Sequence, residues 1–108
     1  MSTTTIRADQ PLTTLVNVFT VAPAAQQDLV DLLVTATDEV MRDRPGFISA
    51  NIHASTDGTR VVNYAQWRTE EDFQSMLRDP AAGKHFAAVY AIASAEPHLY
   101  TVESVHHG

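Results

Sequence analysis

The alternation of apolar and polar positions divides the first part of the chain into a strand and a helix. Residues 12–21 are rich in β-branched side chains, which favour a strand. Pro23 follows at once, and proline is well suited to the first turn of a helix. Between residues 24 and 43 the apolar positions recur at helical spacing, with acidic residues on the other side. This stretch therefore predicts an amphipathic helix.

A hairpin and a short helix are predicted next. Residues 47–54 and 59–67 have strand-like patterns and are joined by a turn that contains Asp57 and Gly58, a strong hairpin signal. Thr69 can then cap a helix, because its hydroxyl can accept a hydrogen bond from a free backbone N–H of the first turn. The inner face of this helix would carry Phe73, Met76 and Leu77.

The last part of the chain predicts another helix and a final strand. Asp79 and Pro80 suit the cap and the first residue of a helix. Its apolar face would consist of Phe86, Val89, Tyr90 and Ala93. Pro97 precedes the expected final strand at residues 98–105. The resulting order β-α-β-β-α-β is that of a ferredoxin-like α+β sandwich, with helices on one face of the sheet.

The other face of this sheet would be bare. Because side chains alternate between the two faces of a strand, the even-numbered residues would occupy the bare face. They are Val16, Val18, Ile48, Ala50, Ile52, Val62 and Tyr64. An uncovered apolar patch of this kind usually marks an interface. We therefore expect a homodimer in which two bare faces bury each other.

The odd-numbered strand positions carry polar groups that would lie under the helices. They are Asn17, Asn51, His53, Asn63 and Trp67. A buried polar group without a partner costs about 1–3 kcal/mol, so these groups must bond to each other or line a cavity. The roof of such a cavity would be made by Phe73, Met76, Leu77, Phe86 and Tyr90. This arrangement predicts a site for a flat, aromatic, mostly neutral small molecule.

Structural roles for the same residues remain open alternatives. The amides of Asn17 and Asn63 could bond the backbone, Trp67 could pack in the core, and His53 could be satisfied beside the hairpin. His85 is expected to face solvent, and the terminal pair at residues 106–107 is more simply a chance pair than a metal site. Five polar or amphipathic groups on one covered face nevertheless favour a common function.

Composition narrows the function classes. The 108 residues suit one domain, which we expect at residues 11–108 after a flexible tail at residues 1–10. A net charge of −6 with 7 Lys and Arg residues argues against nucleic acid, and no apolar run is long enough for a membrane span. The chain has no cysteine and its beginning lacks the features of a signal peptide, so a cytoplasmic location is expected.

Three stretches resemble the antibiotic biosynthesis monooxygenase family. HASTDGTRVVNYAQW at residues 53–67 resembles the central hairpin of its actinorhodin-pathway members, and LVNVFTV at residues 15–21 resembles strand one of its nogalamycin-pathway members. The run from Pro45 to Phe47 is similar to a turn found across the family. The resemblance implies a dimeric α+β barrel that oxidises a polyketide anthrone to a quinone. Molecular oxygen would be the co-substrate, with no flavin, haem or metal.

The resemblance also implies roles for individual residues. Asn17, Asn63 and Trp67 match positions held to be catalytic, and His53 matches a histidine that contacts ligand. The remaining substrate-binding candidates are Asn51, Phe73, Met76, Leu77, Phe86 and Tyr90. Phe73 and Phe86 stand where actinorhodin-type enzymes have a tyrosine and an arginine, which implies a different proton route and a more apolar or differently substituted ligand.

Two other functions are compatible with the same features. A non-catalytic accessory protein of a polyketide pathway would keep the pocket and bind ligand without turnover. A haem-degrading oxygenase would use an asparagine near Asn17 and a haem-ligating histidine near His85. That family's tryptophan would fall near Met76, however, and haem propionates require more basic residues than the chain has.

Overall fold

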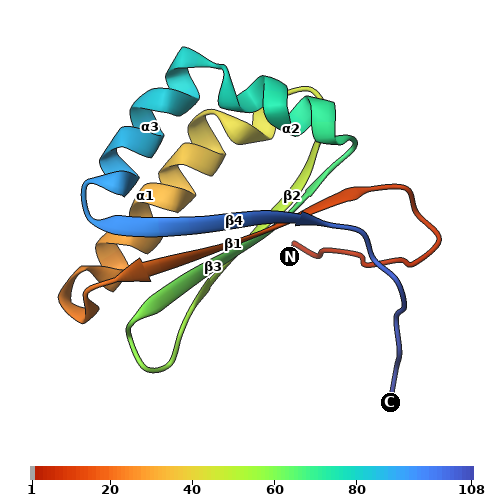
Figure 1. Cartoon of the computed structure of the whole chain (residues 1–108), viewed down its shortest axis with the longest axis horizontal. Helices are drawn as coiled ribbons and strands as arrows, with labels where there is room; N and C mark the ends of the chain where they lie inside the picture. Colours follow the sequence, from red (N-terminus) through yellow and green to blue (C-terminus); the bar gives the residue numbers. More distant parts are fainter. Residues whose placement is uncertain (1) are drawn as a thin grey trace.

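A computed structural model describes residues 2–108 and contains one four-stranded antiparallel sheet with helices on one face (Figure 1). The strands are β1 (Thr13–Val21), β2 (Phe47–Ala54), β3 (Arg60–Trp67) and β4 (Ala93–Tyr100), in the spatial order β2-β3-β1-β4. The helices are α1 (Gln26–Glu39), α2 (Glu70–Leu77) and α3 (Pro80–Tyr90), with single 3₁₀ turns η1 (Pro23–Ala25) and η2 (Met41–Asp43). The ferredoxin-like α+β fold predicted from the sequence is confirmed.

The first helical stretch is divided into three pieces. Pro23 begins η1, and α1 then buries Leu29, Leu33 and Ala36, which follow the apolar spacing of the sequence. The helix ends at Glu39, and the following Val40 has a φ of −124°, which departs from helical geometry, although its N–H still donates to the carbonyl of Ala36. The predicted helix at residues 24–43 therefore contains a shorter α-helix with a 3₁₀ turn at each end.

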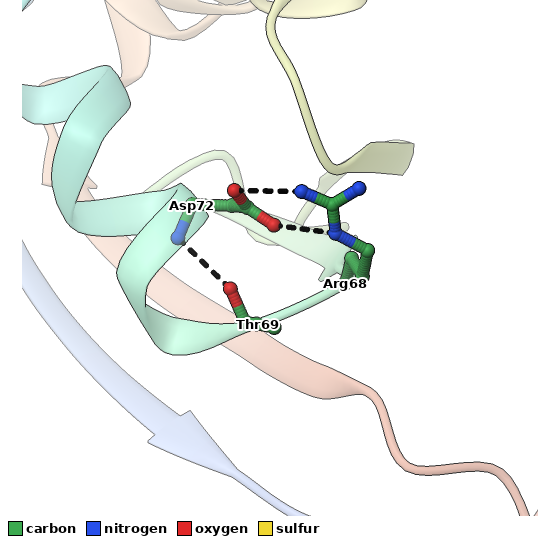
Figure 2. Close-up of polar contacts among 3 residues, drawn as sticks. All are labelled: Arg68, Thr69 and Asp72. Carbon is green, nitrogen blue, oxygen red and sulfur yellow. Dashed lines mark hydrogen bonds and ion pairs between the residues drawn. The ribbon is translucent and has the colours of Figure 1, made fainter.

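The beginning of α2 is fixed by a cap and an ion pair (Figure 2). The Thr69 hydroxyl accepts a hydrogen bond from the backbone N–H of Asp72 at 3.0 Å, which confirms the predicted cap. The Arg68 guanidinium donates to both Asp72 carboxylate oxygens, at 2.9 and 3.1 Å, and this bond holds the pKa of Asp72 below its ordinary value. Gly46, at a φ of +82°, packs directly against that carboxylate. These contacts orient α2 so that Phe73 faces the interior.

The hairpin between β2 and β3 is held by the Asp57 carboxylate. Its Oδ1 accepts hydrogen bonds from the Thr59 N–H at 3.0 Å and from the hydroxyls of Thr59 and Ser55, each at 2.7 Å. These bonds, led by the Thr59 N–H, lower the pKa of Asp57 to about 2. Gly58 supplies the positive φ, +81°, that the turn requires.

A bulge near the start of β2 changes which residues face the helices. Phe47 pairs with Trp67, but Ser49 pairs with Gln66, so Ile48 is an extra residue in this strand. One extra residue reverses the alternation of faces beyond it. Ala50 and Ile52 therefore pack under the helices, and the expectation that they lie on the bare face is wrong.

The same bulge places two candidate site residues on the face opposite the one expected. Asn51 pairs with Tyr64 and His53 pairs with Val62, and all four line a hollow on the sheet face opposite the helices. The expectation that Asn51 and His53 lie under the helices is therefore wrong.

The final strand begins earlier than expected. It spans Ala93–Tyr100 and pairs with β1 alone, so Pro97 lies within an edge strand, where the missing N–H of proline is tolerated. Residues 101–108, assigned partly to the strand from the sequence, leave the sheet without helix or strand (Figure 1).

The N-terminal segment contacts the open face of the sheet. Residues 2–12 contain no helix or strand, and Met1 of the expected tail lies outside the described residues. The Thr4 hydroxyl donates to Asn51 Oδ1 at 2.6 Å, and Gln66 Nε2 donates to the carbonyl of Thr5 at 2.9 Å. Through these bonds the segment covers Gln66, which is 3% exposed. Part of the open face is therefore covered by the chain itself.

Candidate functional site

A cavity of about 500 Å³ lies between the sheet and the helices. This volume is within the range of about 300–1,000 Å³ that small-molecule sites occupy. Its sheet side includes Leu15, Asn17, Phe19, Ala50, Asn63, Ala65 and Trp67. Its helix side includes Leu33, Ala36, Thr37, Phe73, Gln74, Met76, Leu77, Phe86 and Tyr90. The cavity is mainly apolar, with a small number of polar groups placed in its walls.

Two asparagine side chains from neighbouring strands lie at the sheet side of the cavity. Asn17 of β1 and Asn63 of β3 are register partners, so both side chains project from the same face at the same level of the sheet. The Oδ1 atom of each is buried and has no hydrogen-bond partner within residues 2–108. Leaving a buried polar atom unpaired costs about 1–3 kcal/mol. Unpaired polar groups of this kind require an explanation, and a functional site is one of the recurring explanations.

Trp67 is held in the cavity wall by two other aromatic rings. It is 2% exposed and lies at the end of β3. Trp67 follows Asn63 by four residues in this strand, so both side chains project from the same face. Phe47 meets its ring edge-on at 5.4 Å and 83°, and Phe73 meets it at 6.0 Å and 62°. These contacts leave the indole one orientation beside the cavity.

The five residues expected to roof the cavity all line it. Phe73 and Met76 are buried, at 7% and 3% exposure, whereas Leu77 and Tyr90 are 42% and 56% exposed. Phe86 lies next to Tyr90, with ring centroids 6.3 Å apart. The predicted placement of these side chains is confirmed, and the exposed pair indicates where the cavity opens to solvent.

Two of the predicted site residues take part in a different group of contacts. His53 Nδ1 lies 3.0 Å from the carbonyl oxygen of Asn51, and Asn51 Nδ2 donates to the carbonyl of Tyr64 at 3.0 Å. These side chains meet the N-terminal segment on the open face and are separated from the cavity by the sheet. The structure therefore brings together Asn17, Asn63 and Trp67, but not Asn51 and His53.

Two polar residues on the helix side were missed from the sequence. Thr37 of α1 donates its hydroxyl to the Leu33 carbonyl at 2.8 Å and lines the cavity, as does Gln74 of α2. Thr37 lies four residues after the inward-facing Leu33, so helical periodicity could have identified it. Gln74 has no such signal, because its neighbours in the sequence suggest an exposed helical position.

The residues that line the cavity include one histidine, His98 of β4. Within residues 2–108, no Asp, Glu, Lys or Arg side chain lines it. The ion pairs near its walls point elsewhere: Arg44 pairs with Asp79 at 3.2 Å, and His85 Nε2 lies 3.3 Å from Glu39 Oε2. His85 is only 23% exposed and packs against α1, so the expectation that it faces solvent is met in part. The cavity consequently suits a neutral ligand surface.

Residues 2–108 contain neither a metal-binding cluster nor a membrane-spanning helix. Residues 2–108 contain no group of three His, Cys, Asp or Glu side chains arranged to hold a metal ion. Within the same part of the chain, none of the helices has the length and continuous apolar character of a membrane-spanning segment.

Comparisons with known proteins agree with the fold. A family model described as antibiotic biosynthesis monooxygenase matches residues 13–88. Tetracenomycin-F1 monooxygenase of Streptomyces glaucescens is 48% identical over 93 residues, which is 86% of this chain and 83% of that protein.

Two solved structures are similar over most of their length. SnoaB, a cofactor-independent oxygenase from Streptomyces nogalater, is 28% identical with a TM-score of 0.77, over 88% of this chain and 96% of that one. A monooxygenase from the ActVA-Orf6 gene of Streptomyces coelicolor, in complex with nanaomycin D, is 34% identical with a TM-score of 0.80. That alignment covers 89% of this chain and 91% of the other.

Proposed function

The chain belongs to the antibiotic biosynthesis monooxygenase family and is a monooxygenase, and we propose that it oxidises an anthrone-type aromatic polyketide to a quinone with O₂ and no cofactor. The observation that carries this proposal is the grouping of Asn17, Asn63 and Trp67 in one apolar cavity. Two of these side chains have buried polar atoms without a hydrogen-bond partner among residues 2–108. The relative named for tetracenomycin F1 and the solved structure in complex with nanaomycin D support an aromatic polyketide as the ligand class.

The proposed reaction needs little chemistry from the protein. An anthrone has an acidic C–H group, and loss of this proton gives an electron-rich enolate. The enolate passes one electron to triplet O₂, and the resulting radical pair combines to a peroxide. Protonation and loss of water then give the quinone, so one O₂ is consumed and one H₂O is released. The SnoaB description as a cofactor-independent oxygenase supports this route.

The amides and the indole would stabilise the charge that develops on the substrate oxygen. The N–H groups of Asn17, Asn63 and Trp67 are hydrogen-bond donors. A donor held in place for a developing oxyanion contributes about 3–4 kcal/mol to catalysis. Phe47 and Phe73 fix the indole, and pairing between β1 and β3 fixes the two amides. Such a preorganised group of donors would favour the enolate.

His53 is not part of this mechanism. The resemblance implied that His53 contacts the ligand, but its side chain lies on the opposite sheet face. The donors to the enolate oxygen would increase the acidity of the substrate's C–H group. The C–H proton would therefore be lost without help from His53.

The accessory-protein reading remains the second candidate. Phe73 and Phe86 line the cavity without polar groups, which favours ligand binding without a proton route through these positions. The haem-degrading reading is not proposed, because His85 contacts Glu39 and does not line the cavity.

The decisive experiment is O₂ uptake with 1,8-dihydroxyanthrone, using protein checked for metal and flavin, against a control without protein. Uptake that scales with protein and gives the anthraquinone spectrum is the expected result. Binding detected by Trp67 fluorescence without excess uptake would contradict the oxygenase and favour the accessory protein.

A further inference from the structure

The rim of the cavity carries a polar side chain that the proposed reaction does not use. Gln74 lies on α2 immediately after the buried Phe73, and it is exposed while still lining the cavity. Leu77 and Tyr90, which also line the cavity, are 42% and 56% exposed. Gln74 thus lies on the helix side near the opening, and the two asparagines lie on the sheet side.

The surroundings of Gln74 determine what it can recognise. Within residues 2–108 the cavity lining has no Asp, Glu, Lys or Arg, and its exposed polar side chains besides Gln74 include Tyr90 and His98. A ligand group that lies beside Gln74 therefore meets a neutral amide. A glutamine amide offers two N–H donors and a carbonyl acceptor. It can therefore donate to a phenolic oxygen or accept from a phenolic hydroxyl. Such a group would lie on the ring that reaches the opening.

We propose that Gln74 is a specificity-determining residue that hydrogen-bonds a hydroxyl on the outer ring of the polyketide. This inference rests on the proposed function for the nature of the ligand. The reacting ring would lie at Asn17 and Asn63, and the apolar middle of the ligand would pack on Phe86. A ligand without the outer hydroxyl leaves Gln74 hydrated, so it loses one hydrogen bond and keeps the rest of its contacts.

Two quinones that differ by a single hydroxyl test this inference. Emodin carries one lateral hydroxyl that chrysophanol lacks, and neither is consumed by an anthrone oxygenase. Trp67 is the only tryptophan of the chain and lines the cavity, so its fluorescence reports binding of either quinone. Titrations are made at a pH at which all the hydroxyls are neutral. The wild-type protein should bind emodin about three- to tenfold more tightly than chrysophanol.

Replacing Gln74 should remove this preference. Two variants test this: Gln74→Leu, and Gln74→Met, which keeps the length of the side chain. Both should weaken emodin binding to the level of chrysophanol binding. Both should change the dissociation constant for chrysophanol by less than twofold. Gln27→Leu is the matched control, because Gln27 is an exposed glutamine of α1 that bonds Asp31 and does not line the cavity. It should retain the preference.

Several results would overturn the inference. They are no preference or no binding in the wild-type protein, a preference that survives Gln74→Leu, and an equal loss of both quinones in both variants. O₂ uptake separates the two proposals: an intact emodin preference without uptake refutes the oxygenase reaction, and uptake without the preference refutes only the role of Gln74.

Discussion

The asparagine side chains on the two faces of the sheet differ in their hydrogen bonding. Asn17 and Asn63 face each other across β1 and β3, with buried Oδ1 atoms that the protein leaves unpaired. Asn51 has the same side chain, but Thr4, Ser49 and the Tyr64 carbonyl are its partners on the open face. Within residues 2–108, Thr14 Oγ1 and Arg44 Nε are also buried without a partner, but neither residue lines the cavity. Two paired-strand amides with unpaired oxygens in one cavity wall are the pattern expected of a functional site.

This difference predicts opposite results for two alanine variants. Asn63→Ala should lower kcat for 1,8-dihydroxyanthrone by about 100- to 1,000-fold, because one donor to the developing oxyanion is lost. Asn51→Ala removes an equal amide from the other side of the sheet and should keep kcat within about threefold. Steady-state O₂ uptake measures both. Equal losses in the two variants, or full activity of Asn63→Ala, would contradict the assignment of the site.

Turns and caps set the positions of the elements that carry the site. Gly46 and Gly58 both have a positive φ, but their surroundings differ. A Cβ at position 46 would overlap the Asp72 carboxylate, whereas a Cβ at position 58 would meet only Pro23, at 3.6 Å. Asp72 is also the partner of Arg68 at the start of α2. The turn at Gly46 is therefore coupled to the helix that carries Phe73.

Alanine substitutions at the glycines should reveal this coupling. Gly58→Ala should lower the free energy of unfolding by about 1–2 kcal/mol, the cost of a left-handed backbone for alanine. Gly46→Ala should lower it by about 2–5 kcal/mol, because overlap with Asp72 adds to that cost. Urea denaturation gives both values.

A third glycine provides the control for this series. Gly83 lies within α3, and a Cβ there would meet nothing within 4 Å. Gly83→Ala should therefore raise the free energy of unfolding by about 0.5–1 kcal/mol. Similar losses at positions 46 and 58 would show that contact with Asp72 has no effect on stability.

The hairpin should make stability depend on acid pH. The pKa of Asp57 is about 2 in the folded protein and near ~3.9 when unfolded, so its contribution is fully present above the unfolded value. The contribution is lost as the pH falls from ~4 through about 2. Asp57→Asn cannot titrate, so its urea midpoint should fall less steeply across this range than that of the wild-type protein. Parallel profiles would exclude this role of Asp57.

At the scale of the whole molecule, one face of the sheet is not covered by any helix of residues 2–108. Val16 and Val18 pair with Tyr64 and Val62, and all four side chains lie opposite the helices. The N-terminal segment covers the part of this face near Gln66 and Asn51. We propose that a second copy of the chain covers the rest, as the resemblance to a dimeric α+β barrel implies. A domain of this size would gain stability from such burial.

A charge on the open face should prevent this association. Val62→Asp would place a carboxylate in the proposed interface and should raise the dimer dissociation constant by about 100-fold or more. Val34→Asp is the matched control, since Val34 is 42% exposed on α1. It should leave association unchanged. Sedimentation equilibrium checks both variants, and a monomeric wild-type protein would refute the proposal.

Much of the architecture could be predicted because it depends on short-range signals. Thr69 and Asp79 cap their helices as expected, with hydrogen bonds to the backbone N–H groups of Asp72 and Ala81. Asp57 and Gly58 mark the hairpin for the same reason, since turn geometry depends on a few adjacent residues. The final strand was placed too late because Pro97 was taken as its boundary, and only pairing with β1 shows that an edge strand accommodates it.

The amino-acid sequence by itself determined the order of the elements and the positions of Asn17, Asn63 and Trp67, because helical and strand periodicity act within one segment. Only the tertiary structure decided which face Asn51 and His53 occupy. The bulge at Ile48 adds one residue to β2 against its neighbour, and this reverses every later side chain of the strand. The place of Gln74 in the cavity likewise depends on the packing of α2 over the sheet. A site that is assembled from separate segments depends on contacts between them, and a local sequence pattern does not contain those contacts.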